Sequence, residues 1–338
     1  AGGGGGDAGE RRVAVVTGVS GFIGGHIAKS LLDGGRYTEV RGTVRSLSSE
    51  RARAAAAACG EGLELYAADL LEPGSWAEVM GGATHVFHTA SPFKLVVNDV
   101  QGELIDPAVK GTMAVLRAAD AAGTVRRVVM TSSGAAVSDK SKLSEPGYVF
   151  SEKDWNTTSS HDVEPYRYSK TLAERAAWEF AAGKAWRLCT ICPAYVFGPV
   201  LSAAADSTSV LDTKALIDGT YAPPKRAPKG ASGVVDVRDV AEAHLAVAES
   251  ESAEGRYLMS SPEDVTFLER ARLIAAAGCS ELAGLPLPTE EAAPTTARRR
   301  YDCRKVEAML GRPLLPPERV MPDTARSMLE VGLVKRNT

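Results

Sequence analysis

The chain has 338 residues, with 39 basic and 42 acidic side chains, a formal net charge of −3 and 44% hydrophobic residues. This balance is that of an ordinary globular protein, and without a dense basic tract it argues against a nucleic-acid surface. No apolar run approaches the roughly 18 residues that a transmembrane helix needs, so we expect no membrane partner. The five cysteines are an odd number scattered along the chain, which disfavours a disulfide framework and favours a cytoplasmic setting.

Length and composition together predict one large domain and a smaller lobe, because a single core stops growing near roughly 250 to 300 residues. Residues 1–10 are rich in glycine and have nothing to bury, so we expect a flexible tail there. Residues 11–193 alternate short apolar runs with helical segments, as a dinucleotide-binding domain does. Residues 194–338 are predicted to form mainly a substrate-binding lobe, with a segment at about 234–250 returning to the first domain.

In chain order, the predicted elements alternate between strand and helix. Buried strands are expected where apolar runs are bounded by turn residues, at 13–16, 39–45, 63–67, 85–89, 127–131 and 187–191. Helices are expected at 22–32, 51–58, 74–80, 104–122 and 239–249, with a further one carrying residues 166–170. This alternation predicts an α/β fold with a doubly wound parallel sheet of the Rossmann type.

A glycine-rich turn, TGVSGFIG, follows the first predicted strand and opens the first predicted helix. Glycines three apart in this position let the chain turn sharply, let a pyrophosphate approach the backbone and let helix and strand pack closely. The helix N-terminus also offers free N–H groups to phosphates. A purely structural turn is the alternative interpretation. The turn predicts a dinucleotide site made by Gly18, Ser20, Gly21, Phe22, Ile23 and Gly24.

The end of the second predicted strand indicates which dinucleotide is bound. An acid there binds the ribose 2′-hydroxyl of NAD, whereas an arginine accommodates the 2′-phosphate of NADP. The strand ends in VRS, with Arg45 in the middle and no acid before Glu50, so NADPH is the expected cofactor unless Arg45 is only a surface residue. After the third strand, Asp69 and Leu70 are placed to reach the adenine, although an aspartate there serves a turn equally well.

The stretch YRYSK at 166–170 contains two tyrosines and a lysine. Residues four apart share a helix face, so Tyr166 and Lys170 point the same way and Tyr168 points elsewhere. Pro165 marks the first turn of this helix, where we expect the dipole and solvent access to favour a phenolate. A neighbouring ammonium lowers the pKa of a phenol, so Lys170 is expected to make Tyr166 a usable acid. Such a pair can protonate a carbonyl oxygen that receives a hydride.

A third polar element, TSS at 131–133, ends the preceding strand at the carboxyl edge of the predicted sheet. Open α/β proteins bind their ligands at this edge, and a serine hydroxyl there can hydrogen-bond a substrate oxygen. Either serine alone would be interpreted as a helix cap or a strand end. In combination with the glycine turn and the tyrosine–lysine pair, the serine indicates a reductase site.

These elements, in this order, resemble the extended short-chain dehydrogenase/reductases, and above all the plant-type group of dihydroflavonol, anthocyanidin and cinnamoyl-CoA reductases. The similarity runs through nearly the whole chain, including VVTGVSGFIGGHIAKSLL, VFHTASP, VRRVVMTSSGAAV, YSKTLAERAAWEF, ICPAYVFGP and VVDVRDVAEAHLAV. The resemblance implies an NADP-dependent oxidoreductase in which Ser133 is the catalytic serine, Tyr166 the proton donor and Lys170 its partner and ribose ligand. It also implies that Arg45 contacts the 2′-phosphate, and that the nicotinamide is lined by Thr89, Ala90, Pro193 and Val196.

In three places the sequence departs from the family pattern, and these departures concern the proton relay and the substrate. The asparagine that many members carry after the fourth strand is absent from the stretch DPAVKGT at 106–112, which leaves the proton relay open. The cinnamoyl-CoA reductase motif NWYCYGK is EPYRYSK here, which counts against a CoA thioester substrate. Ser138 stands where dihydroflavonol reductases use an asparagine to hold a catechol ring, which weakens that assignment.

The sequence therefore predicts an NADPH-dependent reductase of a small aldehyde or ketone, flavonoid-like, phenylpropanoid-like or more general. Candidate substrate contacts, argued from position alone, are Phe93, Ala135 and Tyr195. Two alternatives remain open: an extended-type nucleotide-sugar epimerase or dehydratase, and an NADP(H)-sensing protein without turnover. We expect a monomer, with a dimer possible.

No metal site is predicted, because the five histidines are dispersed. Cys189 and Cys192 have CxxC spacing but lie in an apolar run without a second pair, so we expect buried strand residues. His88 lies near the expected cofactor and is predicted to be a packed strand histidine rather than a catalytic one.

Overall fold

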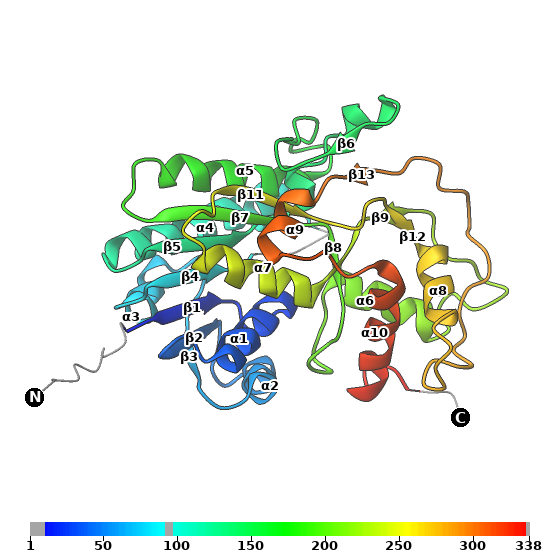
Figure 1. Ribbon diagram of the computed structural model, residues 1–338, viewed down its shortest axis with the longest axis horizontal. Helices are drawn as coiled ribbons and strands as arrows, with labels where there is room; N and C mark the ends of the chain where they lie inside the picture. Colours follow the sequence, from blue (N-terminus) through cyan, green and yellow to red (C-terminus); the bar gives the residue numbers. More distant parts are fainter. Residues whose placement is uncertain (1–10, 92–96, 336–338) are drawn as a thin grey trace, which may run out of the picture.

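The computed structural model describes residues 11–91 and 97–335, so the predicted tail at 1–10 lies outside the described residues. Its main element is a seven-stranded parallel sheet of order β11-β7-β5-β4-β1-β2-β3. This confirms the predicted doubly wound fold (Figure 1). The strands are β1 (Val13–Thr17), β2 (Glu39–Val44), β3 (Leu63–Ala67), β4 (His85–His88), β5 (Arg127–Thr131), β7 (Arg187–Pro193) and β11 (Gly255–Met259).

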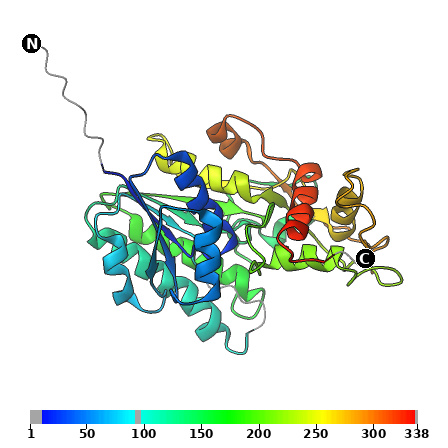
Figure 2. The same ribbon diagram turned by 90° about the horizontal axis from the view of Figure 1, so that it is seen from below.

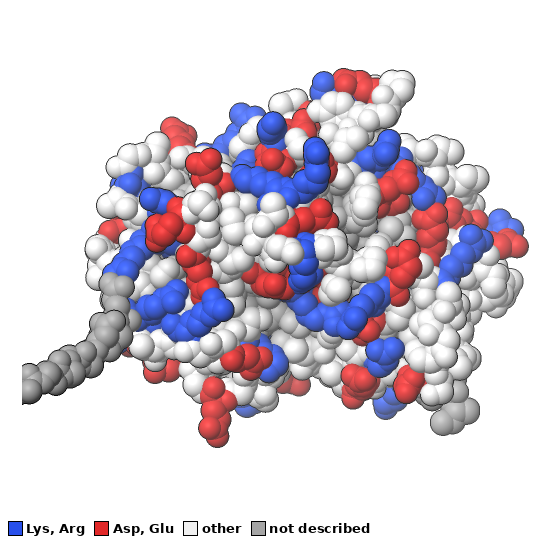
Figure 3. Space-filling model, viewed as in Figure 1, with Lys and Arg blue, Asp and Glu red and all other residues white. Residues whose placement is uncertain are grey.

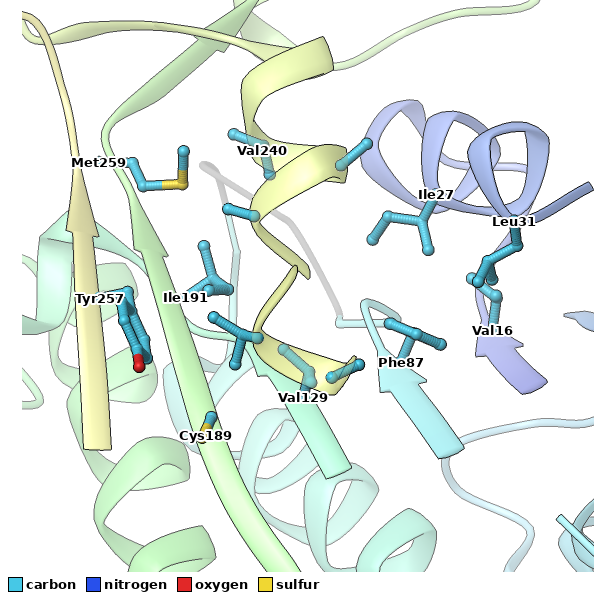
Figure 4. Close-up of a cluster of buried hydrophobic side chains, with 14 of the residues drawn as sticks. Val16, Ile27, Leu31, Phe87, Val129, Cys189, Ile191, Val240, Tyr257 and Met259 are labelled. Atoms are coloured by element: carbon cyan, nitrogen blue, oxygen red, sulfur yellow. The ribbon is translucent and has the colours of Figure 1, made fainter. Parts of the chain in front are cut away.

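Alternate side chains of β1 enter two separate cores, because neighbouring residues of a strand point to opposite faces of a sheet. Val16 packs in one core with α1 (Phe22–Gly34) and α7 (Val237–Glu249), as Figure 4 shows. Val15 packs in the other core with α4 (Asp106–Ala121). Helices therefore cover both faces of the sheet, which is clear from below in Figure 2.

The remaining helices of the main domain extend these two layers. On the α1 face, α2 packs beside α1 and α9 beside α7, while α5 packs beside α4 on the other face. Their bounds are α2 (Glu50–Cys59), α3 (Ala77–Met80), α5 (Pro165–Ala181) and α9 (Arg304–Leu310), with 3₁₀ turns at Pro73–Trp76, Gly134–Ala136 and Lys140–Ser144.

The smaller lobe lies beside the sheet, on the right in Figure 1, and has an apolar core of its own. This core is formed by α6 (Thr208–Ile217), α8 (Phe267–Ala275) and α10 (Pro317–Glu330), together with β8 (Tyr195–Phe197) and β10 (Val234–Asp236). After β10 the chain returns to the main domain, where α7 packs on α1 and β11 pairs with β7. The sheet thus takes its edge strand β11 from the part of the sequence assigned mainly to the lobe.

The described residues also form three two-stranded pairs. The strand β8 pairs in parallel with β10, β9 pairs antiparallel with β12, and β6 pairs in parallel with β13. The additional strands are β6 (Val149–Phe150), β9 (Ala231–Ser232), β12 (Val265–Thr266) and β13 (Arg300–Tyr301).

Two of the predicted helices begin with a turn that is not α-helical. The helix expected at 104–122 starts with a π-helical turn at Gln101–Ile105, before α4. Pro107 has no N–H to donate to the carbonyl four residues earlier. The regular α-helical hydrogen bonds of α4 therefore start next to this proline. The helix expected at 74–80 is a 3₁₀ turn followed by the short α3.

The strand order reverses at β1, which pairs with β2 on one side and with β4 on the other. The connections that follow β1 and β4 therefore run in opposite directions. In open α/β sheets the ligand crevice lies outside the carboxyl ends of the strands at such a point. The turn after β1 and the residues after β4 therefore border the expected ligand-binding crevice.

Candidate active site

The turn between β1 and α1 is packed too closely to hold side chains at two of its glycines. Gly18 has φ of +72°, and a Cβ there would lie 3.1 Å from Ala90. A Cβ on Gly24 would lie 2.5 Å from the carbonyl oxygen of Gly18 and 2.8 Å from Oγ1 of Thr89. Gly21 is the N-cap of α1, and no side chain caps this helix. The first backbone N–H groups of α1 therefore face the turn as an anion-binding surface.

The other predicted residues of this turn lie where the motif placed them. Ser20 is exposed next to the N-cap, and Phe22 and Ile23 are the first two residues of α1. The residues proposed to hold the pyrophosphate thus form one continuous stretch at the carboxyl end of β1.

Thr17 joins the glycine turn to the end of β4. Its hydroxyl oxygen accepts the N–H groups of Thr89 at 3.1 Å and Ala90 at 2.9 Å, and it lies 2.9 Å from Nδ1 of His88. Because two N–H groups already donate to this oxygen, its own proton goes to Nδ1, which leaves the imidazole proton on Nε2. Burial, with a smaller effect from the Lys170 ammonium, lowers the pKa of His88 to about 3. His88 is therefore a neutral, packed strand histidine, as predicted.

The predicted ribose and adenine contacts lie after β2 and β3. Arg45 is exposed directly after the last residue of β2. Asp69 accepts the N–H of the residue two positions later at 2.8 Å, so its carboxylate serves the turn. The side chain of Leu70 packs against Gly111 of α4.

The two serines after β5 have different partners. Ser132 is buried and donates to the carboxylate of Glu174 at 2.6 Å. Ser133 is half-buried, its Oγ accepts the N–H of Ala135 at 3.1 Å, and it hydrogen-bonds the hydroxyl of Tyr166. The structure therefore brings Ser133, and not Ser132, to the tyrosine.

Tyr166 and Lys170 share one face of α5, and Nζ of Lys170 lies 5.8 Å from the centroid of the tyrosine ring. Burial raises the pKa of Tyr166 to about 12, against the opposing effect of the hydrogen bond with Ser133. The pKa of Tyr166 is thus raised, whereas the sequence led us to expect a lowered pKa. The reason is that burial disfavours the phenolate more strongly than the neighbouring groups stabilise it. The ammonium of Lys170 donates to Oγ of Ser91 at 2.9 Å, and burial lowers the pKa of Lys170 to about 8.

Two of the three predicted substrate contacts lie in the described residues, Tyr195 on β8 and Ala135 in the turn after β5. Tyr195 is half-buried and is near enough to Tyr166 to raise its pKa electrostatically. Ala135 is held beside Ser133 through its N–H group. Phe93 lies outside the described residues.

The residues proposed to flank the nicotinamide lie at the end of β7 and on β8. Pro193 is the last residue of β7, and a Cβ on Gly134 would lie 3.4 Å from its carbonyl oxygen. Pro193 is thus next to the segment that carries Ser133. Val196 is the central residue of β8 and is half-buried.

Ser138, compared above with a catechol-binding asparagine, is buried and fully engaged within the protein. Its hydroxyl donates to the carbonyl oxygen of Gly134 at 2.9 Å and accepts Nη2 of Arg167 at 2.8 Å. A substrate therefore has no access to this hydroxyl. Sequence reasoning missed Arg167, although it lies inside the YRYSK motif.

A buried ion pair supports the site and was also missed. Glu174 follows Lys170 by four residues, so it continues the same face of α5, and this spacing was the available signal. Its carboxylate accepts hydrogen bonds from Ser132, from Thr190 at 2.8 Å and from Arg256 at 2.7 Å. Glu174 thereby ties α5 to β5, β7 and β11 directly beneath the catalytic candidates.

The described residues give little support to a metal site, a membrane-spanning helix or a strongly charged surface. Within 11–91 and 97–335, no group of three or more His, Cys, Asp or Glu side chains could hold a metal ion. In the same ranges, no helix combines the length and apolarity needed to cross a bilayer. Cys189 and Cys192 are buried in β7, as predicted. Figure 3 shows positive and negative side chains interspersed over the face in view, without a field of one sign.

Comparison with known proteins shows the family to which the chain belongs. The model of the NAD dependent epimerase/dehydratase family matches residues 14–259. The chain is 40% identical over 253 residues to cinnamoyl-CoA reductase CAD2 of Medicago truncatula. This match covers 73% of this chain and 75% of that protein. It is 34% identical over 322 residues to tetraketide alpha-pyrone reductase 1 of Arabidopsis thaliana, covering 94% and 95% of the two chains.

Among solved structures, the yeast methylglyoxal/isovaleraldehyde reductase Gre2 complexed with NADPH has a TM-score of 0.82 and 28% sequence identity. The match covers 95% of this chain and 100% of the yeast chain. With the family model matching most of the chain, this protein belongs to the NAD dependent epimerase/dehydratase family, the extended short-chain dehydrogenase/reductases that its motifs resemble.

Proposed function

We propose that this protein is an NADP-dependent reductase that acts on the carbonyl group of a small aldehyde or ketone. The observation that carries the proposal is the hydrogen bond between Ser133 and Tyr166, with Lys170 on the same helix face, at the carboxyl edge of the sheet. The NADPH in the yeast neighbour and the reductase names of the plant relatives support the cofactor and the reaction class.

The residues present fit NADPH. The close approach at Gly18 and Gly24 makes a backbone cradle that a Cβ would fill, as a pyrophosphate site requires. In this proposal, Arg45, which is exposed after β2, contacts the 2′-phosphate, and Lys170 contacts the ribose hydroxyls. When bound, NADPH supplies the hydride.

The protein's part in the reaction is to hold the carbonyl oxygen and to protonate it. With a pKa raised to about 12, the phenol of Tyr166 keeps its proton at neutral pH and can donate it as negative charge develops on the oxygen. Ser133 supplies a second hydrogen bond to that oxygen from its place beside the tyrosine. The serine thus orients the oxygen, and the tyrosine completes the alcohol.

The substrate is proposed only as a class. The relatives are named for cinnamoyl-CoA, a tetraketide pyrone, and methylglyoxal or isovaleraldehyde, which share a reducible carbonyl and little else. The engagement of Ser138 by Arg167 removes one hydroxyl that could have held a catechol ring. This favours a compact carbonyl substrate over a dihydroflavonol.

The test is a panel of carbonyl compounds assayed by loss of NADPH absorbance, with product analysis. We expect oxidation of NADPH matched by formation of the alcohol for at least one small aldehyde or ketone. Tight retention of the cofactor with conversion of a sugar nucleotide and no net oxidation would indicate the epimerase alternative instead. Binding of NADPH without any turnover across the panel would indicate a sensing protein.

Arg45→Ala is expected to weaken NADPH binding by about 10- to 100-fold, because a hydrogen bond to a charged group contributes roughly 1.5–3 kcal/mol. Binding of NADH, which has no 2′-phosphate, should change little. Fluorescence titration with both dinucleotides measures the effect. Arg53→Ala is a matched control, since Arg53 is exposed nearby and donates to the carbonyl of Ser48. An equal loss for both dinucleotides would remove Arg45 from the phosphate site.

Gly24→Ala is expected to abolish measurable dinucleotide binding and to lower stability. Alanine in a helix normally stabilises by roughly 0.5–1 kcal/mol relative to glycine, but here its Cβ would collide with the Gly18 carbonyl at 2.5 Å. Gly34→Ala in the same helix is the control, because its Cβ meets no atom within 4 Å. Thermal unfolding with and without NADPH measures both effects. A Gly24→Ala protein that still binds NADPH normally would contradict the cradle.

A further inference from the structure

We propose that Ser91 positions the ammonium of Lys170 and carries protons between that amine and solvent during turnover. The proposal rests on the proposed reductase function and deepens it. Ser91 lies inside the VFHTASP segment, between the predicted cofactor residues Thr89 and Ala90 and the residues that follow. The proposal also answers the question of the proton relay, which the stretch 106–112 left open.

Ser91 is a half-buried residue in direct contact with a buried amine. Nζ of Lys170 donates to Oγ of Ser91 at 2.9 Å, across 79 residues of sequence. Lys170 is buried, with 9% of its surface exposed, whereas Ser91 is half-buried. A buried ammonium needs a hydrogen-bond acceptor, and Ser91 supplies one that is also nearer to water.

Two other groups near Lys170, Tyr166 and His88, do not take this role. Tyr166, from the same helix, is the group that must be reprotonated. Lys170 acts on His88, from β4, electrostatically, and Nδ1 of His88 already accepts the hydroxyl proton of Thr17. Because burial holds His88 neutral, it does not compete for the proton that Lys170 exchanges.

The proton transfers balance. Tyr166 gives its proton to the carbonyl oxygen, and the resulting phenolate is restored with a proton from the Lys170 ammonium. The neutral amine then takes the hydroxyl proton of Ser91 while that oxygen accepts a proton from water. One solvent proton enters for each alcohol formed, which is the stoichiometry of carbonyl reduction. Since burial lowers the pKa of Lys170 to about 8, the amine can lose and regain a proton near neutral pH.

The first test compares Ser91→Ala, Ser91→Thr and the surface control Ser144→Ala in steady-state kinetics with NADPH. We expect Ser91→Ala to lower kcat by about tenfold, with the KM for NADPH changed less than about threefold, and to move the alkaline limb of the kcat profile to lower pH. Ser91→Thr, which keeps the hydroxyl, should restore most of the rate. An unchanged kcat and an unmoved alkaline limb in Ser91→Ala would overturn the proposal.

The second test needs no turnover. In cofactor-free protein labelled with ¹⁵N-lysine, NMR titration follows the Lys170 amine, identified by its loss in Lys170→Met. The pKa of Lys170 should fall in Ser91→Ala, because the ammonium loses the acceptor that stabilises it, and should stay near the wild-type value in Ser91→Thr. An identical titration in wild type and Ser91→Ala would overturn the assignment. A wild-type protein inactive on every carbonyl would defeat the proposed function, while this titration would still decide the role of Ser91.

Discussion

Replacing Tyr166 with phenylalanine is expected to lower kcat for carbonyl reduction by about 10²- to 10⁴-fold, the usual contribution of a positioned general acid. The ring and its packing stay, while the proton and the hydrogen bond with Ser133 are lost. NADPH affinity should change little, because the phenol contributes no charge to binding. Single-turnover and steady-state measurements with the best substrate of the panel, alongside a direct NADPH titration, separate the two quantities.

Tyr168→Phe is the matched control for this change. Tyr168 lies on the same helix two residues away, so it points to another side and should keep wild-type kinetics. A Tyr166→Phe enzyme that retains full NADPH oxidation would disprove the assignment of the acid. Loss of activity in both variants, accompanied by lower melting temperatures, would point to damage to α5 rather than to lost chemistry.

The pH dependence follows from the two shifted groups. A phenol whose pKa is raised to about 12 remains protonated through the neutral range, so ionisation of Tyr166 should not reduce the rate there. The amine of Lys170, with its pKa lowered to about 8, deprotonates first as the pH rises. We therefore expect the alkaline fall in kcat to begin near pH 8 and to follow Lys170.

Glu174→Ala is expected to destabilise the protein by about 3–5 kcal/mol, because removing one partner of a buried ion pair leaves the other charge uncompensated. Glu174 is fully buried, and Arg256 contacts both of its carboxylate oxygens, at 2.7 and 3.0 Å. Denaturant unfolding measures the free energy. The rate should fall as well, since Ser132, which donates to this carboxylate, directly precedes Ser133.

Two controls make the origin of this loss clear. Glu179→Ala, exposed on the same helix, should change the unfolding free energy by less than about 0.5 kcal/mol. The double variant Glu174→Leu with Arg256→Met removes both charges and should recover much of the stability lost in Glu174→Ala. A Glu174→Ala protein as stable as the wild type would show that the ion pair contributes little.

The sequence alone determined the features that depend on neighbours along the chain. The glycine spacing at 18–24 and the alternation around β1 predicted the cofactor side of the fold, because turn conformation and strand alternation are local properties. The helix period placed Tyr166 and Lys170 on one face without any knowledge of what covers them.

The tertiary structure decided everything that depends on contacts between distant segments. The residues after β5 do not by themselves distinguish the two serines, and only the resemblance implied Ser133. In the structure, Ser132 donates to Glu174 and Ser133 faces the tyrosine. The direction of the Tyr166 pKa shift depends on burial, which the sequence around the tyrosine does not specify. Ser91 and Arg256 meet α5 across 79 and 82 residues. Such pairings arise from how the strands and helices pack, and side-chain periodicity records only which face of each element is apolar.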